Sequence, residues 1–102
     1  FKENCPDLRN TKVVDVIREL EDYGAVVDVH DPQADAAEAR HEYGIEIVDQ
    51  PRPGQYDAIV LAVSHRQFIE QGSEAIRAFG KPEHVLYDLK YALPMGAADL
   101  RL

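Results

Sequence analysis

The segment from Ala58 to Val63 constrains the fold of this chain most strongly, because it reads Ala-Ile-Val-Leu-Ala-Val without a polar residue. A strand with one face in water alternates apolar and polar side chains. This unbroken apolar run therefore predicts a strand that is buried on both faces, as in the middle of a parallel sheet. The run is far too short to span a bilayer, and no signal peptide is recognised, so we expect no membrane-spanning segment.

Helical and extended patterns alternate along the rest of the chain. Apolar residues recur at helical spacing after Thr11, and a glycine stands where each of the first two helices should end. The predicted helices are 11–23, 34–43 and, in two pieces around Gly72, 66–71 and 73–79. The predicted strands are 25–30, 45–48, 58–63 and 85–87, with a loop at 49–55 and an irregular tail after Leu93.

This alternating order predicts a three-layer α/β fold with a mostly parallel sheet. A chain of 102 residues suits one domain with a single core, so we expect residues 1–102 to form one domain. In such folds ligands bind at the carboxyl ends of the strands, where the strand order reverses. The residues that follow the predicted strands are therefore the first candidates for a binding site.

The charge of the chain excludes several classes of partner. The formal net charge is −8, and no basic face is visible, which argues against nucleic acid and against an anionic membrane surface. A phosphate-bearing ligand would have to meet a local positive site. The single cysteine, Cys5, cannot form an internal disulfide, which fits a reducing, cytoplasmic location.

Such a positive site is predicted at the start of the sequence. Residues 1–9 form a polar segment that carries Lys2 and Arg9 and leads into the helix beginning near Thr11. The first turn of a helix presents unpaired backbone N–H groups and the positive end of the helix dipole, which suits an anion. The residues by themselves support an anion site without naming the anion.

Other polar residues have competing interpretations. Asp31 precedes Pro32, so it is favoured as a turn former over a ribose acceptor. His65 can cap the following helix or contact a neighbouring domain as readily as it can touch a ligand. The remaining histidines (His30, His41 and His84) lack metal-ligand spacing to carboxylates or thiols, so no metal site is expected.

Cys5 has two interpretations as well. A cysteine beside cations can be a nucleophile, but no histidine is adjacent in sequence, and free cysteines more often act as small apolar side chains. We therefore expect no catalytic residue in this chain. It also lacks Gly-x-Gly-x-x-Gly, the dinucleotide-binding fingerprint.

The opening run, Phe-Lys-x-Asn-x-x-Asp-x-Arg at residues 1–9, resembles the start of the C-terminal, UDP-binding domain of the UDP-glucose/GDP-mannose dehydrogenase family. The resemblance extends over nearly the whole chain, through His-Asp-Pro at 30–32, Tyr-Asp-Ala at 56–58, Ser-His-x-x-Phe at 64–68 and Tyr-Asp-Leu-Lys at 87–90. The details look most like members that oxidise UDP-N-acetylhexosamines for bacterial surface polysaccharides, with UDP-glucose as the nearest competing substrate.

The resemblance implies a three-domain parent enzyme. Members of the family have an N-terminal NAD-binding domain, a central domain that forms a dimer, and a Rossmann-like C-terminal domain that helps to hold the UDP-sugar. They oxidise the sugar C6 alcohol to a carboxylate in two NAD-dependent steps. The nucleophilic cysteine of the family lies in the central region and does not match Cys5. The chain would thus be a fragment that is inactive alone, from a cytoplasmic parent that is a homodimer or larger.

The resemblance also assigns binding residues. Phe1 and Lys2 match the family pair that contacts the nucleotide sugar. Arg9 matches an arginine that reaches the NAD cofactor, although an ion pair with a neighbouring acid is the simpler interpretation of its charge alone. Relatives use a further arginine for the substrate phosphate, and here Lys90 and Tyr91 stand near that strand end, with Arg101 beyond them.

The family topology places a central strand before Phe1, which this sequence has no residues to build. With that strand included, the expected order is 45–48, 25–30, the absent strand, 58–63, 85–87. The competing class is a non-catalytic nucleotide-binding or receiver-like signalling module. A receiver needs an acceptor aspartate on a later strand, whereas the most apolar strand here is followed by Ser64 and His65.

Overall fold

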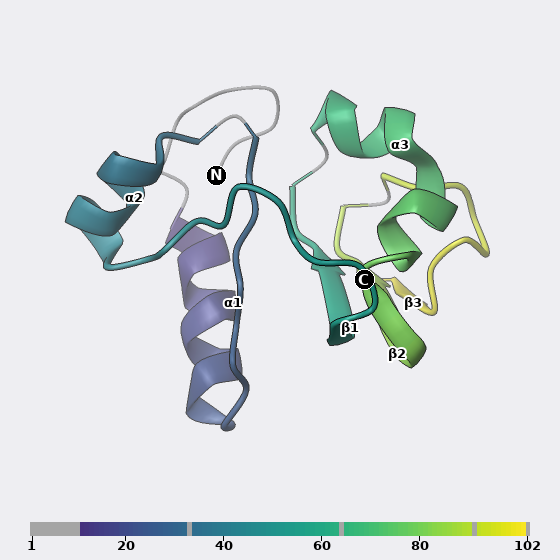
Figure 1. The fold of residues 1–102 in the computed structure, drawn as a ribbon, viewed down its shortest axis with the longest axis horizontal. Coiled ribbons are helices and arrows are strands. Elements are labelled where there is room, and N and C mark those ends of the chain that lie inside the picture. The colour runs from purple at the N-terminus through teal and green to yellow at the C-terminus, as the bar shows by residue number, and fades with distance from the viewer. Residues whose placement is uncertain (1–10, 33, 64, 91, 102) are drawn as a thin grey trace. The chain divides into compact units, whose positions relative to one another are not determined.

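The computed structural model describes residues 11–32, 34–63, 65–90 and 92–101 (Figure 1). The chain divides into two compact units, Phe1–Pro51 and Arg52–Leu102. Each unit combines helix with parallel pairing of extended segments. The prediction of a small α/β fold with parallel pairing is therefore confirmed.

The first unit contains the helices α1 (Thr11–Asp22) and α2 (Ala36–Tyr43), close to their predicted ranges. Val14 and Ile17 are buried on one side of α1. The N-terminus of α2 is capped by Asp35, whose side chain accepts a hydrogen bond from the backbone N–H of Glu38 at 3.0 Å. Gly44 ends the helix at φ 67°, a left-handed conformation that glycine adopts without a steric penalty.

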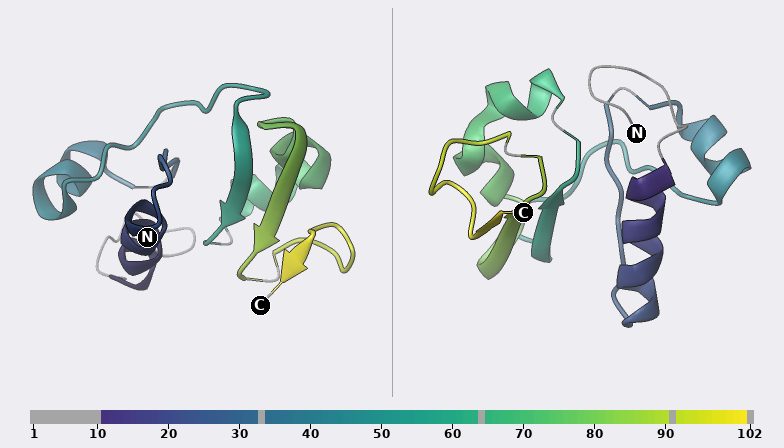
Figure 2. Two further views of the ribbon diagram at one scale, coloured as in Figure 1. Left: turned by 90° about the horizontal axis from the view of Figure 1, so that it is seen from below. Right: turned by 180° about the vertical axis from the view of Figure 1, so that it is seen from behind.

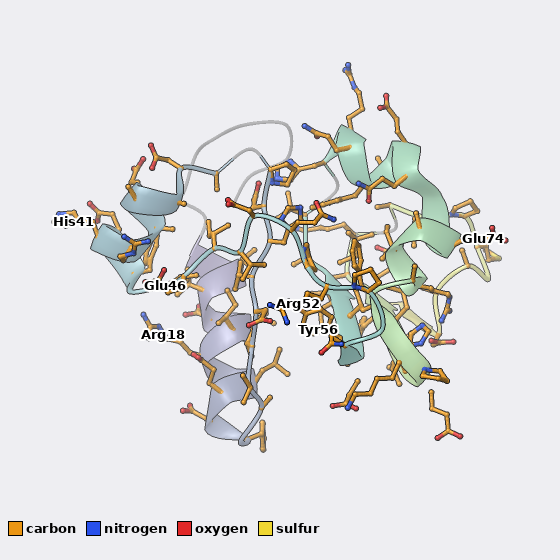
Figure 3. All side chains as sticks on the ribbon, viewed as in Figure 1. Arg18, His41, Glu46, Arg52, Tyr56 and Glu74 are labelled. Carbon is orange, nitrogen blue, oxygen red and sulfur yellow. The ribbon has the colours of Figure 1, made fainter. Side chains whose placement is uncertain are left out.

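Arginine side chains hold the end of α2 in place within this unit. Arg18 of α1 donates to the carbonyl oxygen of Tyr43 at 3.0 Å. Arg40 makes two hydrogen bonds to the carboxylate of Glu46, at 2.9 and 3.2 Å. Arg18 and Glu46 are labelled in Figure 3. Because exposed ion pairs contribute only about 0–1 kcal/mol each, these contacts orient the helix end more than they stabilise it.

The predicted strands 25–30 and 45–48 appear as one parallel bridge between Val29 and Ile47. The backbone N–H of Val48 donates to the carbonyl oxygen of Val29 at 2.8 Å. The predicted pairing is confirmed, but the predicted strand lengths are wrong. Val26 is 95% exposed, so the early part of this segment has no buried face to support a longer ladder.

The second unit is a parallel sheet with one crossover helix. Its elements are β1 (Tyr56–Leu61), α3 (Arg66–Arg77), β2 (Gly80–Asp88) and β3 (Leu100–Arg101), and the strand order is β1-β2-β3. Both strand pairings are parallel, with Leu61 opposite Asp88 and Tyr87 opposite Leu100. Figure 2 shows this sheet from two further directions, with α3 beside the β1–β2 pair.

The strand bounds differ from the predictions. β1 covers 56–61 rather than 58–63, and β2 covers 80–88 rather than 85–87. β2 begins earlier than predicted because Gly80 pairs with Tyr56, and Lys81 and Pro82 lie in the irregular stretch before the ladder resumes at Val85. The prediction of an irregular tail is wrong at β3, because the N–H of Asp99 donates to the carbonyl oxygen of Leu86 at 2.9 Å.

The core of this unit lies between the sheet, α3 and the segment after β2. Its buried members are Leu61, Ile76, Leu86 and Leu93, and Phe68 packs against them. Gly72 breaks the helical backbone of α3 at φ 81°, which confirms the predicted interruption. On the other face of β1, Val60 is 37% exposed. One face of β1 is thus covered by the core, and the prediction of a central strand buried on both faces is wrong for the described sheet, in which β1 lies at an edge.

Gly80 starts β2 where the chain approaches a side chain closely. A Cβ atom added there would lie 2.7 Å from Nδ1 of His84 and 2.8 Å from its Cδ2. Real Cβ atoms essentially never come this close to other atoms. The imidazole therefore occupies the space that any larger residue at position 80 would need.

We expect Gly80→Ala to lower the free energy of unfolding by about 1–3 kcal/mol, because the added methyl group overpacks this space. Chemical denaturation of the two single variants and of Gly80→Ala/His84→Ala measures the effect. The cost of Gly80→Ala should largely disappear in the His84→Ala background. An equal cost in both backgrounds would show that the imidazole is not the cause.

Candidate functional site

The residues predicted to bind ligands at the start of the sequence, Phe1, Lys2 and Arg9, lie outside the described residues, as do Cys5 and Tyr91. Their assignments stay predictions. The structure does describe the carboxyl edge of the parallel strands, where α/β folds commonly bind ligands. The candidate site is therefore built from the segments that follow β1 and β2.

The carboxyl ends of β1 and β2 lie side by side. Their last residues, Leu61 and Asp88, are partners in the ladder. The N–H of Leu89 then donates to the carbonyl oxygen of Leu61 at 3.0 Å, which carries the pairing one residue beyond β2. Both following segments therefore leave from the same edge, as the parallel arrangement requires.

Asp88 organises the turn that follows β2. Its side chain is fully buried, yet its carboxylate accepts three backbone hydrogen bonds. Oδ1 accepts from the N–H groups of Lys90 and Ala92, both at 3.1 Å, and Oδ2 accepts from Leu93 at 2.9 Å. Hydrogen bonds to charged groups contribute about 1.5–3 kcal/mol each, so they offset much of the cost of burying this carboxylate.

Lys90 is the cation that this turn carries. Its side chain is exposed, and its ammonium group makes no hydrogen bond or ion pair with the residues that the structure describes. Most other charges of the chain are negative, since the formal net charge is −8. A lysine at this edge can act as a mobile point charge on a phosphate group.

His65 follows β1 and takes the N-cap position of α3. Its carbonyl oxygen accepts from Phe68 and Ile69, at 3.0 and 3.3 Å, but its side chain makes no capping hydrogen bond. The ring is fully buried and lies 5.5 Å from the ring of Phe68, centroid to centroid. His65 therefore stands at the N-cap position without capping the helix through its side chain, and contact with a ligand or a neighbouring domain stays a prediction.

Asp31 also takes its simpler role. It is 7% exposed, and its Oδ1 accepts a hydrogen bond from the N–H of Ala34 at 3.1 Å. An aspartate that binds the backbone a few residues ahead in this way stabilises a turn. The prediction that Asp31 forms the turn before α2 is confirmed.

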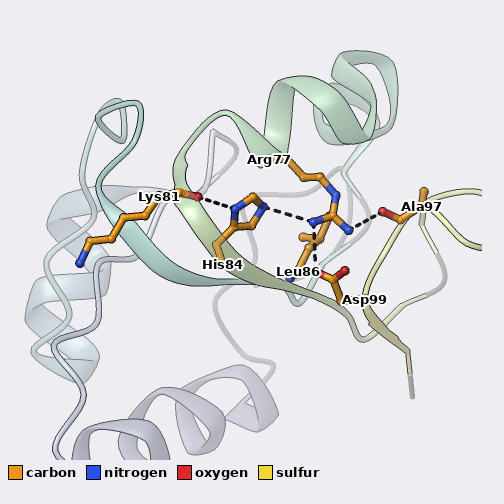
Figure 4. Close-up of polar contacts among 6 residues, drawn as sticks. All are labelled: Arg77, Lys81, His84, Leu86, Ala97 and Asp99. Carbon is orange, nitrogen blue, oxygen red and sulfur yellow. Dashed lines mark hydrogen bonds and ion pairs between the residues drawn. The ribbon is translucent and has the colours of Figure 1, made fainter.

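Arg77 joins α3 to the C-terminal segment through a polar network that the sequence did not indicate (Figure 4). Its guanidinium donates to Oδ2 of Asp99 and to the carbonyl oxygen of Ala97, both at 3.0 Å. The same Asp99 oxygen accepts from the N–H of Leu86 at 2.8 Å. This network fixes the tail beside β2 and so allows β3 to form.

The network also determines which nitrogen of His84 carries a proton. Nε2 lies 3.2 Å from Nη1 of Arg77, and Nδ1 lies 2.7 Å from the carbonyl oxygen of Lys81. An arginine can only donate and a carbonyl oxygen can only accept. Nε2 is therefore the acceptor, and Nδ1 carries the hydrogen that is donated to Lys81.

We expect Asp99 to contribute to stability against acid. The hydrogen bond from Arg77, and then that from Leu86, lower the pKa of Asp99 below its ordinary value of 3.8. A lowered pKa in the folded state gives stability that is complete above 3.8 and is lost as the pH falls through the lower, folded value. Denaturant unfolding measured from neutral pH to below 3.8 should show that the free energy of unfolding falls less in Asp99→Asn than in the wild type. Identical losses would contradict this contribution.

The described residues show neither a metal-binding cluster nor a membrane-spanning helix. Across 11–32, 34–63, 65–90 and 92–101, no group of three or more His, Cys, Asp or Glu residues is placed to hold a metal ion. Within the same ranges, no helix has the length and apolar character needed to cross a membrane. The described part of the site is thus a main-chain turn with one exposed lysine.

The profile of one known family matches most of the chain. The profile of the UDP-glucose/GDP-mannose dehydrogenase family, UDP binding domain, matches residues 1–95. This match covers the residues predicted at the start of the sequence and the turn after β2. No solved structure matches the chain.

Curated relatives resemble the chain over most or all of its length. It is 57% identical over 102 residues to UDP-N-acetyl-D-glucosamine 6-dehydrogenase of Salmonella typhi and 61% identical over 102 residues to the protein of that name from Pseudomonas aeruginosa. It is 40% identical over 90 residues to Protein CapL of Staphylococcus aureus. The chain spans 24%, 24% and 21% of the lengths of these relatives.

Proposed function

The chain belongs to the UDP-glucose/GDP-mannose dehydrogenase family, and from this membership we propose that it is the UDP-sugar-binding part of an NAD-dependent UDP-N-acetylhexosamine 6-dehydrogenase. The observation that carries the proposal is the identity of 57% and 61%, over the whole chain, to two UDP-N-acetyl-D-glucosamine 6-dehydrogenases. UDP-N-acetylglucosamine is therefore the first substrate to test, and UDP-glucose the second.

The proposed fold is a three-layer, Rossmann-like domain with a mostly parallel sheet. The crossover from β1 through α3 to β2 supports it, because this β-α-β unit is the repeating element of such folds. The parallel bridge of Val29 with Ile47 supports it for the first unit.

The proposed contacts with substrate involve two parts of the chain. Phe1 packs against the bound nucleotide sugar, and Lys2 binds its oxygens or its diphosphate. Lys90 is a further candidate for the diphosphate, because the turn after β2 presents it at the carboxyl edge of the sheet. No contact is assigned to Tyr91 or Arg101.

Arg9 is assigned to NAD, whose pyrophosphate suits a guanidinium group. When bound, NAD supplies the hydride acceptor for oxidation at C6 of the sugar. The chain has no Gly-x-Gly-x-x-Gly run, so Arg9 would supplement a nucleotide site formed mainly elsewhere in a parent enzyme. Cys5 is not assigned as the nucleophile. The parent is proposed to be a cytoplasmic homodimer or larger assembly.

The described residues do not favour the receiver-like alternative. A receiver domain needs an accessible aspartate at the end of a central strand to accept a phosphoryl group. β1 ends at Leu61, and Asp88 at the end of β2 is fully buried with its carboxylate engaged by three N–H groups. Phosphorylation of Asp88 would require the turn to open.

We expect the isolated chain to bind UDP weakly and in a salt-sensitive manner, since its cations form only one wall of the proposed cleft. Titration calorimetry with UDP measures this affinity. Lys2→Ala should weaken binding about tenfold, the loss expected for one charge-assisted contact, whereas the control Lys81→Ala should not, because Lys81 pairs with Asp57 at 3.0 Å. Tight binding that is unaffected by Lys2→Ala would remove Lys2 from the site.

In a full-length enzyme that carries this chain, the two N-terminal cations should affect different ligands. Lys2→Ala should mainly raise the KM for the UDP-sugar, and Arg9→Ala mainly the KM for NAD, each by about tenfold. Cys5→Ser should leave turnover largely intact. Steady-state formation of NADH, with UDP-N-acetylglucosamine and UDP-glucose compared, checks all three. Loss of turnover in a folded Cys5→Ser enzyme would overturn the assignment of the nucleophile.

A further inference from the structure

Asp88 is a fully buried carboxylate at the end of β2. Burying a carboxylate is costly unless it is hydrogen-bonded, and removing it would leave the N–H groups of Lys90, Ala92 and Leu93 without this acceptor. Its three hydrogen bonds with described residues come from main-chain N–H groups of the turn after β2, and none comes from a described side chain. The carboxylate therefore determines the path of that turn.

The turn after β2 is fixed at both ends, whereas the side chain of Lys90 within it is exposed. Leu93 is 4% exposed and belongs to the core, and Leu89 continues the pairing of β2 with β1. Between these anchors, Lys90 is exposed while its own N–H is bound to Asp88 at 3.1 Å. The backbone position of Lys90 is thus set directly by the buried carboxylate.

We propose that Asp88 is a positioning residue of the UDP-sugar site, which holds the turn after β2 so that the ammonium group of Lys90 faces the diphosphate of the ligand. The inference rests on the proposed function. Asp88 itself does not touch the ligand, because its carboxylate is fully buried and engaged by the turn. The ligand class is a nucleoside diphosphate, whose negative charge matches an exposed lysine at a strand edge in an otherwise acidic chain.

The test uses the full-length enzyme with Asp88→Asn, Lys90→Ala and the double variant. Asparagine keeps the size of the side chain but places an NH₂ group where an oxygen now accepts an N–H, so one side of the turn loses its bond. Asp88→Asn should raise the Kd for UDP and the KM for the UDP-sugar by about three- to tenfold, with little change in kcat or in the KM for NAD. The double variant should bind UDP no more weakly than Lys90→Ala alone.

Asp99→Asn is the matched control. Asp99 also accepts a backbone N–H, from Leu86 at 2.8 Å, but it makes no hydrogen bond to the described residues of the turn that carries Lys90. Asp99→Asn should lower the free energy of unfolding without changing the affinity for UDP. If Asp88→Asn and Asp99→Asn lower stability alike and both leave the KM for the UDP-sugar unchanged, Asp88 has only a structural role and the inference fails.

A measurement on the wild type keeps the test independent of folding in the variants. Hydrogen–deuterium exchange with and without UDP should show slower exchange for the amides of residues 90–93, while the amides of α2 stay unchanged. Unchanged exchange at 90–93 in the presence of bound UDP would overturn the inference. So would additive effects of Asp88→Asn and Lys90→Ala on the Kd.

The proposed function and this inference fail in different ways. If the wild-type enzyme neither binds UDP nor oxidises a UDP-sugar, the proposed function is wrong, and the inference falls with it. If the wild type binds UDP, but Lys90→Ala and Asp88→Asn bind it equally well, the proposed function stands and the inference alone is wrong.

Discussion

The parallel pairing of β1 with β2 is the constraint on which the second unit depends. Two parallel strands cannot be joined by a tight turn, so the chain must return through a crossover, and α3 provides it. That helix brings Ile76 onto the sheet, where it closes the core with Leu61 and Leu86. The same pairing places both carboxyl ends at one edge, which makes this edge the natural binding position.

Two carboxylates, the buried Asp88 and the exposed Asp99, then determine where the chain goes after β2. Asp88 gathers three N–H groups of the turn, and Asp99 gathers one N–H and the guanidinium of Arg77. Neither aspartate is placed to hold a metal with the other described residues. Both accept hydrogen bonds from main-chain N–H groups, and such bonds order a segment that lacks regular secondary structure. The candidate site thus depends on polar groups that need not touch the ligand themselves.

Much of the fold could be predicted from sequence because its signals are local. Helical periodicity and the glycines at 24 and 44 located α1 and α2, and Gly72 located the break in α3. The strand lengths and β3 could not be predicted, because they depend on partners distant in the chain. β2 begins at Gly80 because this residue pairs with Tyr56 of β1, and β3 depends on the contact of Asp99 with Leu86.

The alternation of helices and strands, the acidic character and the family all follow from the amino-acid sequence, since each depends on residue types and their spacing. The sequence also identified Lys2 and Arg9 as the cations of the opening segment. The burial of Asp88 against the turn of Lys90, and the contacts of Arg77 with Asp99 and His84, depend instead on how the chain packs in three dimensions. The physical reason is that a carboxylate looks the same in a sequence whether it faces water or main-chain N–H groups, and only packing removes the water.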